Sequence, residues 1–133
     1  MDKNLRIGII GAGRIGKLHA NNLVSRVPGA HLCAVSDVYE PAAKELAEKL
    51  GIPSYTSNYH DILNNPDINA VFICSSTDTH SPISIEAARA GKHIFCEKPI
   101  DHDLDKIRAV LEAVKEAGVK YQGGFNRRFD KNF

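Results

Sequence analysis

The chain has 133 residues, which is enough for one domain of common size and too few for two. Its charges nearly balance, with 17 Lys and Arg against 16 Asp and Glu, and no basic stripe interleaved with aromatic residues is present. We therefore expect no nucleic-acid partner. The apolar run at residues 7–10 stops at Gly11, which excludes an ordinary signal peptide or a membrane-spanning helix there. We expect a cytoplasmic protein that does not bind a membrane.

Cys33, Cys74 and Cys96 are odd in number, widely spaced and set among apolar neighbours, which favours buried free thiols over disulfides. No C-x-x-C pattern occurs, and the six histidines do not fall in the pairs that ligate a metal. We expect no metal site.

Apolar runs alternate with helical patterns along the chain, each helix ending near a Gly or Pro. The predicted strands cover residues 5–10, 30–36, 52–55, 70–74, 92–96 and 119–123. The predicted helices cover residues 14–26, 40–50, 81–90 and 103–117, with one or two further helical turns near residues 59–63. Such alternation requires parallel strands joined by right-handed crossovers. The sequence therefore predicts a doubly wound α/β domain with strand order 3-2-1-4-5-6 and no linker to a second domain.

Apolar residues at helical spacing support each helix; in the second helix they form its inward stripe and in the last helix one apolar face. In the first helix these are Ile15, Leu18, Ala20 and Leu23, in the second Ala43, Leu46, Ala47 and Leu50, and in the last Leu104, Ile107, Leu111 and Val114. Ser81 and Pro82 are expected to begin the helix over residues 81–90.

Gly11, Gly13 and Gly16 form a G-x-G-x-x-G pattern between the first predicted strand and the first predicted helix. In a dinucleotide site the first glycine permits the tight turn, the second lets backbone approach a pyrophosphate, and the third lets helix pack on strand. The pyrophosphate would then cap the start of the helix, at Arg14 and Ile15. Asp37 follows the second predicted strand about 20 residues later, where such folds place the acid that binds a ribose hydroxyl. The sequence thus predicts an NAD(P)-binding Rossmann fold.

Further polar segments follow the fourth, fifth and sixth predicted strands, and parallel strands end at one edge of the sheet. The segment 75–80 is rich in hydroxyls that could donate to the cofactor or could instead cap the next helix. Lys98 stands between a buried strand and a proline. A partly buried amine there could exchange a proton with a substrate hydroxyl, although an exposed surface lysine is the other interpretation. Arg127 and Arg128 offer donors for a phosphate or a polyol, or form a solvated pair.

Together these motifs resemble the glucose-fructose oxidoreductase and inositol dehydrogenase family of nicotinamide-dependent dehydrogenases, over nearly the whole chain. The motifs are Gly11-Ala12-Gly13-Arg14-Ile15-Gly16, Thr77-Asp78-Thr79-His80, Glu97-Lys98-Pro99 and Gly124-Phe125-Asn126-Arg127-Arg128-Phe129. The resemblance implies that Lys98 is the catalytic lysine, that Glu97 lies near the cofactor and that the bond before Pro99 is cis. It also implies that Arg127 contacts the polyol and cofactor region, as in inositol dehydrogenases. The candidate cofactor-binding residues are Gly11, Gly13, Arg14, Ile15, Gly16, Asp37, Ser75, Ser76, Thr77, His80, Glu97, Lys98 and Arg127.

The resemblance implies the cofactor-binding half of an enzyme that transfers a hydride between NAD and a hydroxyl carbon of a cyclic polyol or sugar. NADP is less expected, because the Asp37 carboxylate would repel a 2′-phosphate. Enzymes of this family continue into a second, substrate-binding domain, whereas this chain stops at Phe133. We expect residues 1–133 to form the cofactor domain, inactive by itself, of a protein that is a homo-oligomer when full length. The alternatives are a non-catalytic NAD-binding module that acts through a partner and, less favoured, a methyltransferase that uses S-adenosylmethionine.

Overall fold

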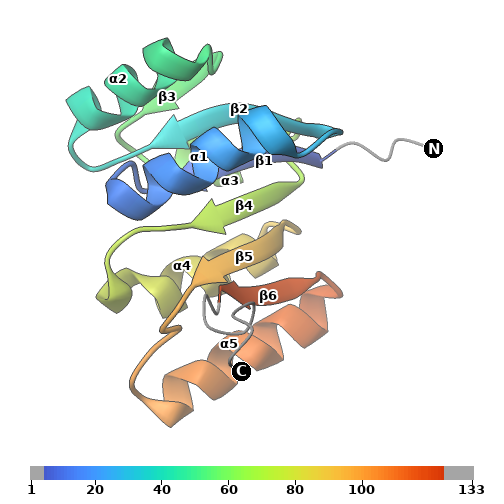
Figure 1. Ribbon diagram of the computed structural model, residues 1–133. Helices are drawn as coiled ribbons and strands as arrows, with labels where there is room; N and C mark the ends of the chain where they lie inside the picture. The colour runs from blue at the N-terminus through green and yellow to red at the C-terminus, as the bar shows by residue number, and fades with distance from the viewer. Residues whose placement is uncertain (1–4, 125–133) are drawn as a thin grey trace, which may run out of the picture.

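The computed structural model describes residues 5–124. Strands and helices alternate along this part of the chain, as Figure 1 shows. The strands are β1 (Leu5–Ile10), β2 (Ala30–Ser36), β3 (Ser54–Thr56), β4 (Ala70–Ile73), β5 (His93–Glu97) and β6 (Tyr121–Gly124). The helices are α1 (Arg14–Arg26), α2 (Glu40–Leu50), α3 (His60–Leu63), α4 (Thr77–Arg89) and α5 (Leu104–Ala117).

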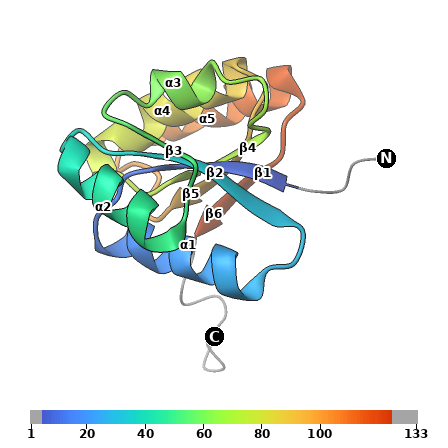
Figure 2. The ribbon, with the colours of Figure 1, turned by 90° about the horizontal axis from the view of Figure 1, so that it is seen from above.

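Within the described residues the strands form one parallel sheet in the order β3-β2-β1-β4-β5-β6. Seen from above, α1 and α2 cover one face of the sheet and α3, α4 and α5 cover the other (Figure 2). The predicted fold class and strand order are confirmed. This topology brings the carboxyl ends of β1 and β4 together at the centre of one edge, where the chain reverses direction across the sheet.

The core lies on both faces of the central strands. Ile7 and Ile9 of β1 pack beneath α1 and α2, whereas Val71 and Ile73 of β4 belong to the cluster on the opposite face. All four side chains are fully buried. A continuous apolar run suits these strands because helices cover each face of a parallel sheet.

Helix α1 buries a narrower stripe than the spread of its apolar residues suggests. Gly16, Ala20 and Leu23 are buried, whereas Ile15 and Leu18 are exposed. Of the apolar residues whose spacing supported this helix, Ala20 and Leu23 are therefore buried and Ile15 and Leu18 are not. Gly16, Ala20 and Leu23 are also spaced by four and three residues, so they lie on one face of the helix. This narrower stripe faces the sheet because α1 starts in direct contact with the glycine turn.

The predicted face of α5 is covered only in part: Val114 packs against the core and Ile107 is half-buried. Val110 and Ala113 are its buried residues, and Leu104 and Leu111 are exposed by 71% and 51%. The helix packs against α4 as its main neighbour, so it buries only a narrow stripe of its surface. An apolar pattern that extends around much of the helix did not identify that stripe.

Helix α4 begins at Thr77, four residues before the predicted start, so Pro82 lies inside the helix. Its missing amide would have bonded the carbonyl of Asp78. Both Pro82 and Asp78 are exposed, so water can solvate that carbonyl. The hydroxyl-rich segment thus contributes the first turn of the helix rather than a loop ahead of it.

The three cysteines all lie in the described part of the chain and are free thiols. Cys96 is buried as predicted, but Cys33 and Cys74 are half-buried. No helix among residues 5–124 is long and apolar enough to cross a membrane.

Candidate functional site: a pocket at the carboxyl ends of the central strands

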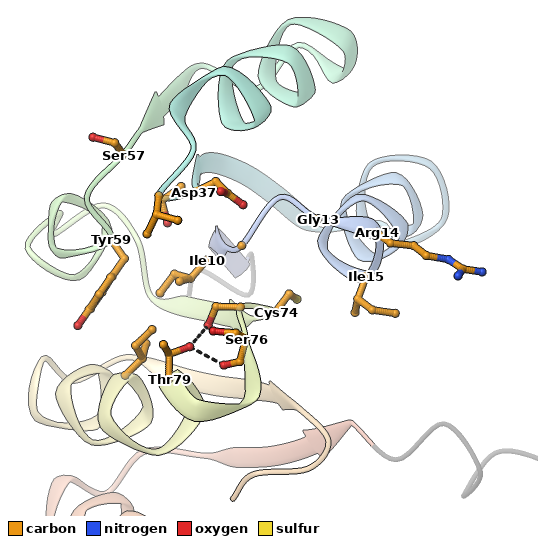
Figure 3. Close-up of a pocket in the computed structure, with 15 residues that line it drawn as sticks. Ile10, Gly13, Arg14, Ile15, Asp37, Ser57, Tyr59, Cys74, Ser76 and Thr79 are labelled. Atoms are coloured by element: carbon orange, nitrogen blue, oxygen red, sulfur yellow. Dashed lines mark hydrogen bonds between the residues drawn. The ribbon is translucent and has the colours of Figure 1, made fainter.

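A pocket of about 460 Å³ opens where β1, β2 and β4 end (Figure 3). The glycine turn forms one side, the segment after β2 a second side, and the start of α4 a third. The lining residues are Ile10, Gly11, Gly13, Arg14, Ile15, Ser36, Asp37, Val38, Ser57, Tyr59, Cys74, Ser75, Ser76, Thr79 and Ile83. Its size is typical of small-molecule and cofactor sites.

Gly11 and Gly16 are required by the packing of the turn itself. Gly11 has φ +105°, and a Cβ there would lie 2.6 Å from the carbonyl carbon of Cys74. A Cβ on Gly16 would lie 1.9 Å from the carbonyl oxygen of Gly11. Both contacts are with backbone, which cannot rotate away. These glycines therefore let β4 and α1 approach the turn closely.

Gly13 differs, because a Cβ there would meet no heavy atom of the described residues within 4 Å. Its φ and ψ of −78° and −161° are open to other residues as well. Packing within the domain therefore does not explain this glycine. The open space lies at the pocket wall, where a ligand can approach the backbone.

The start of α1 offers amide donors to that same space. Gly13 is the N-cap residue, and the first helical hydrogen bond runs from the Lys17 amide to the Gly13 carbonyl at 2.9 Å. Among the described residues no side chain caps the helix, and its first turn has no acidic residue. Unpaired amides and the helix dipole favour an anion here, so this feature fits a pyrophosphate.

Asp37 joins the glycine turn to the segment that follows β2. One carboxylate oxygen accepts from the Ala12 amide at 2.7 Å and the other from the Tyr39 amide at 2.9 Å. A carboxylate has about four acceptor sites, so each oxygen can accept one further hydroxyl. Figure 3 shows Arg14 pointing away from Asp37. The negative charge of Asp37 therefore faces the pocket without this guanidinium beside it, an arrangement that suits two ribose hydroxyls and not a phosphate.

The hydroxyls at the start of α4 form a directed chain. Thr79 Oγ1 donates to the Ser76 carbonyl at 2.6 Å, so the Ser75 hydroxyl, 2.7 Å from Thr79 Oγ1, must be the donor in that second contact. Ser75 Oγ thus keeps its lone pairs for a ligand hydroxyl. Ser76 is the N-cap by backbone conformation, but its side chain makes no capping bond. The side chain of Ser76 is therefore not engaged in capping the helix.

Two neutral groups complete the electrostatics of the pocket. Burial and the carboxylate of Glu86, which accepts from the Tyr59 hydroxyl at 3.1 Å, raise the pKa of Tyr59 to about 12. Burial and the charge of Glu97 raise the pKa of Cys74 to about 12, so its thiol is protonated at neutral pH. Cys74 is therefore not an activated nucleophile.

Glu97 and Lys98 lie beside the pocket but do not line it. Glu97 ends β5 and is buried, with Oε1 2.6 Å from Nε2 of His19 on α1. The His19 ring also meets Phe72 and Phe95 edge-on, at centroid distances of 5.6 and 5.2 Å. Lys98 follows Glu97 and is exposed, so of the two environments that the sequence left open for this lysine the structure has the exposed one. The Lys98–Pro99 bond is cis, which confirms that expectation.

His80 has a different position from the one that the sequence suggested. It is buried beneath the site, and both ring nitrogens contact backbone carbonyls, Pro99 at 2.7 Å and Ser75 at 2.8 Å. With both nitrogens occupied, His80 has no ring donor or acceptor left for a cofactor. It supports the site from behind.

The pocket thus brings together seven of the predicted residues: Gly11, Gly13, Arg14, Ile15, Asp37, Ser75 and Ser76. Gly16, Thr77, His80, Glu97 and Lys98 do not line it, and Arg127 lies outside the described residues. The unpredicted lining residues are Ile10, Ser36, Val38, Ser57, Tyr59, Cys74, Thr79 and Ile83. Four of them, Ile10, Ser36, Val38 and Cys74, end or directly follow a strand or flank Asp37, so strand ends could have revealed them. Thr79 belongs to the hydroxyl-rich segment 75–80, whereas nothing in the sequence marks Ser57 or Tyr59. No group of three His, Cys, Asp or Glu side chains that could hold a metal occurs in residues 5–124.

A protein-family model described as an oxidoreductase family with an NAD-binding Rossmann fold matches residues 5–125. The chain belongs to this family. The resemblance that its motifs predicted is thereby confirmed.

Individual relatives agree with this assignment. An uncharacterized oxidoreductase of Bacillus subtilis is 50% identical over 133 residues, all of this chain and 39% of the relative. The myo-inositol 2-dehydrogenase of Thermotoga maritima is 46% identical over 129 residues, 97% of this chain and 38% of the relative. The crystal structure of scyllo-inositol dehydrogenase from Lactobacillus casei, with bound NAD(H) and scyllo-inositol, superposes with a TM-score of 0.91 at 36% identity. That match covers 97% of this chain and 38% of the solved one, so the chain spans less than two fifths of the length of these relatives.

Proposed function

We propose that the pocket binds NAD and that the chain is the cofactor-binding half of a dehydrogenase acting on an inositol-like cyclic polyol. The observation that carries the proposal is the open space at Gly13, in front of uncapped helix amides and within the same pocket as Asp37. A pyrophosphate and a ribose need these two features side by side. The Lactobacillus casei structure, which contains NAD(H) and has the same fold, supports this choice of cofactor.

Each group of the pocket has a role in holding the cofactor. The first amides of α1 would bind the pyrophosphate next to Gly13, and Asp37 would accept from the two adenosine ribose hydroxyls. Ser75 Oγ, already a donor to Thr79, would accept from a further hydroxyl. The carboxylate at Asp37 favours NAD over NADP, because a 2′-phosphate would be repelled.

Lys98 is the residue that we assign to the chemistry. It follows β5, which neighbours β4 in the sheet, so Lys98 and the Ser75 segment emerge at the same edge. Bound NAD supplies a nicotinamide ring that accepts or returns a hydride. Lys98 would hold the substrate hydroxyl and take its proton as the carbonyl forms, and its exposure in this domain leaves it accessible to a substrate. The substrate class rests on relatives that are inositol dehydrogenases.

The experiment uses the full-length protein that carries this domain. Purified protein should reduce NAD in the presence of myo-inositol or scyllo-inositol, followed by absorbance of the reduced cofactor, and NADP should support less turnover. NAD binding without turnover on a panel of cyclic polyols and sugars would favour the non-catalytic module. Absence of NAD binding would overturn the proposal. The 133-residue chain should bind NAD but turn over no polyol, because we expect a second domain to complete the substrate site.

The cellular context is part of the same proposal. Three free thiols are typical of a protein kept in a reducing compartment, which supports the cytoplasm. Assembly of the full-length protein into a homo-oligomer stays a prediction, which sedimentation velocity would test.

A further inference from the structure

His80 is a buried histidine whose two ring nitrogens both face acceptors. Nδ1 lies 2.7 Å from the Pro99 carbonyl oxygen and Nε2 lies 2.8 Å from the Ser75 carbonyl oxygen. The residue is 2% exposed, so no solvent shell replaces either partner. A carbonyl oxygen only accepts, and a neutral imidazole has only one N–H. Both contacts are hydrogen bonds only if His80 carries two protons and a positive charge.

The surroundings of His80 favour that charge. Burial by itself lowers the pKa of His80, but the interaction with Cys96 and the hydrogen bonds to the two carbonyls outweigh burial and raise the pKa to about 9. The elements around His80 carry further titratable groups. These are Asp78, Glu86 and Arg89 on α4, Cys74 after β4, His93, Cys96 and Glu97 on β5, Lys98, Asp101, His102 and Asp103 in the segment after β5, Asp105, Lys106, Arg108, Glu112, Lys115 and Glu116 on α5, which packs against α4, and Tyr121 on β6. Burial and Cys96 hold the Tyr121 hydroxyl in its neutral form.

The two carbonyls belong to different parts of the site. Ser75 lines the pocket at the end of β4, whereas Pro99 belongs to the segment after β5 and is bonded directly to Lys98. On the other side of Lys98, Glu97 is held by His19 from α1. The lysine is therefore flanked by two residues that histidines hold from opposite faces of the sheet.

We propose that His80 is a positioning residue whose imidazolium ties the Ser75 segment of the cofactor pocket to the Pro99 segment that carries Lys98. The inference rests on the proposed function for the role of Lys98. It rests on geometry alone for the two hydrogen bonds from the His80 ring to the two carbonyls. Charge-assisted hydrogen bonds are about twice as strong as neutral ones. Loss of one proton would turn one contact into a repulsion between two lone pairs, and the two segments would separate there.

The first test observes the proton directly in the isolated chain by NMR. At pH 7 both His80 ring nitrogens should carry protons, and the carbonyl carbon signals of Ser75 and Pro99 should titrate together with the ring, with one midpoint near pH 9. His31→Gln, which changes an exposed histidine on β2, supplies the control, because it should leave the titration of these carbonyl signals unchanged. A His80 ring that is neutral at pH 7, or carbonyl signals that do not follow the ring, would overturn the proposal.

The second test uses the full-length protein and separates positioning from cofactor binding. In His80→Gln, which keeps a neutral donor, kcat should fall by at least about tenfold, while the Kd for NAD rises by less than about threefold. His80→Ala should lose more, and His31→Gln should match wild type. Equal losses in kcat and NAD affinity would mean a general disruption of the pocket and would contradict the positioning role. Absence of turnover in the wild type would instead count against the proposed function, and the NMR result would still decide the state of His80.

Discussion

Replacing Gly13 with Ala separates ligand binding from folding more cleanly than any other change in the glycine turn. The new Cβ meets no described heavy atom within 4 Å, and φ −78° with ψ −161° is allowed for Ala. The free energy of unfolding should therefore stay the same or rise by up to about 1 kcal/mol, because Ala has less freedom than Gly in the unfolded chain. NAD binding should weaken. A phosphate oxygen bonds an amide at about 2.9 Å, whereas a methyl carbon requires about 3.5 Å or more.

The expected loss follows from the bonds that the methyl group displaces. A hydrogen bond to a charged group contributes about 1.5–3 kcal/mol, so losing one such bond should raise the Kd for NAD by at least about tenfold. Isothermal titration calorimetry measures the Kd, and urea denaturation measures the stability of the same protein.

Gly16→Ala is the matched control, because its Cβ would lie 1.9 Å from the Gly11 carbonyl oxygen. That clash should cost about 1–3 kcal/mol of stability or more, with or without NAD. If Gly13→Ala bound NAD within about twofold of wild type, the open space at Gly13 would not be the pyrophosphate site.

Three further changes test other parts of the site. Asp37→Ala should narrow the preference for NAD over NADP, because the carboxylate that repels a 2′-phosphate is removed; calorimetry with both dinucleotides measures the gap, and an unchanged gap would remove Asp37 from the ribose site. In the full-length protein Lys98→Met should lower kcat by roughly 10²–10⁴, about 3–5 kcal/mol, with the Kd for NAD unchanged; turnover within about threefold of wild type would make Lys98 an ordinary surface lysine. The pKa of His80 is about 9, against 6.5 for an ordinary histidine, so the folded state holds the ring proton more tightly than the unfolded chain does. The stability that this proton contributes is therefore complete below pH 6.5 and is lost as the pH rises through 9. Between these pH values the free energy of unfolding should fall by about 2–3 kcal/mol more in wild type than in His80→Gln, as urea denaturation at each pH would measure, and parallel curves would mean that the proton contributes nothing.

The strand order and the glycine turn were predictable because each depends on a local pattern with one structural solution. Long apolar runs separated by helices leave little choice but a parallel sheet. Gly11 and Gly16 were assigned to the tight turn and to helix packing from spacing, and the close backbone contacts around each match these tasks. The approach of a pyrophosphate to Gly13 stays a prediction, for which the structure offers open space. Asp37 was located in the same way, as the acid that ends the second strand.

The faces of α1 and α5 could not be derived in this way, because their apolar residues extend over more than one possible stripe. Ile15 and Leu18 have the volume of core residues, yet α1 approaches the sheet so closely at Gly16 that small side chains occupy the contact. In α5 the choice between Leu111 and Val110 depends on where α4 lies. That position is a tertiary property that helical periodicity does not contain.

His80 and His19 show a second limit of the sequence. The partners of His80 are carbonyl oxygens of Ser75 and Pro99, and a backbone carbonyl has no signature in the amino-acid sequence. In the chain, three strands and three helices lie between the helix that carries His19 and the strand that carries Glu97. Only the folded sheet brings the two side chains together. The position of His19, about one helical turn after Gly16, indicates that its side chain can face the sheet. The sequence does not indicate that Glu97 is its partner.

NMR titration of the isotope-labelled chain with NAD tests whether this pocket is the NAD site, since it reports where the ligand binds as well as whether it binds. We expect the largest amide shifts on residues 11–16, on Asp37 and on Ser75 and Ser76, which line or adjoin one pocket. Gly13→Ala should weaken these shifts together, because the amides at the start of α1 hold the pyrophosphate. Shifts confined to other surfaces, or none at concentrations far above those typical of nicotinamide sites, would contradict the assignment of this pocket to NAD.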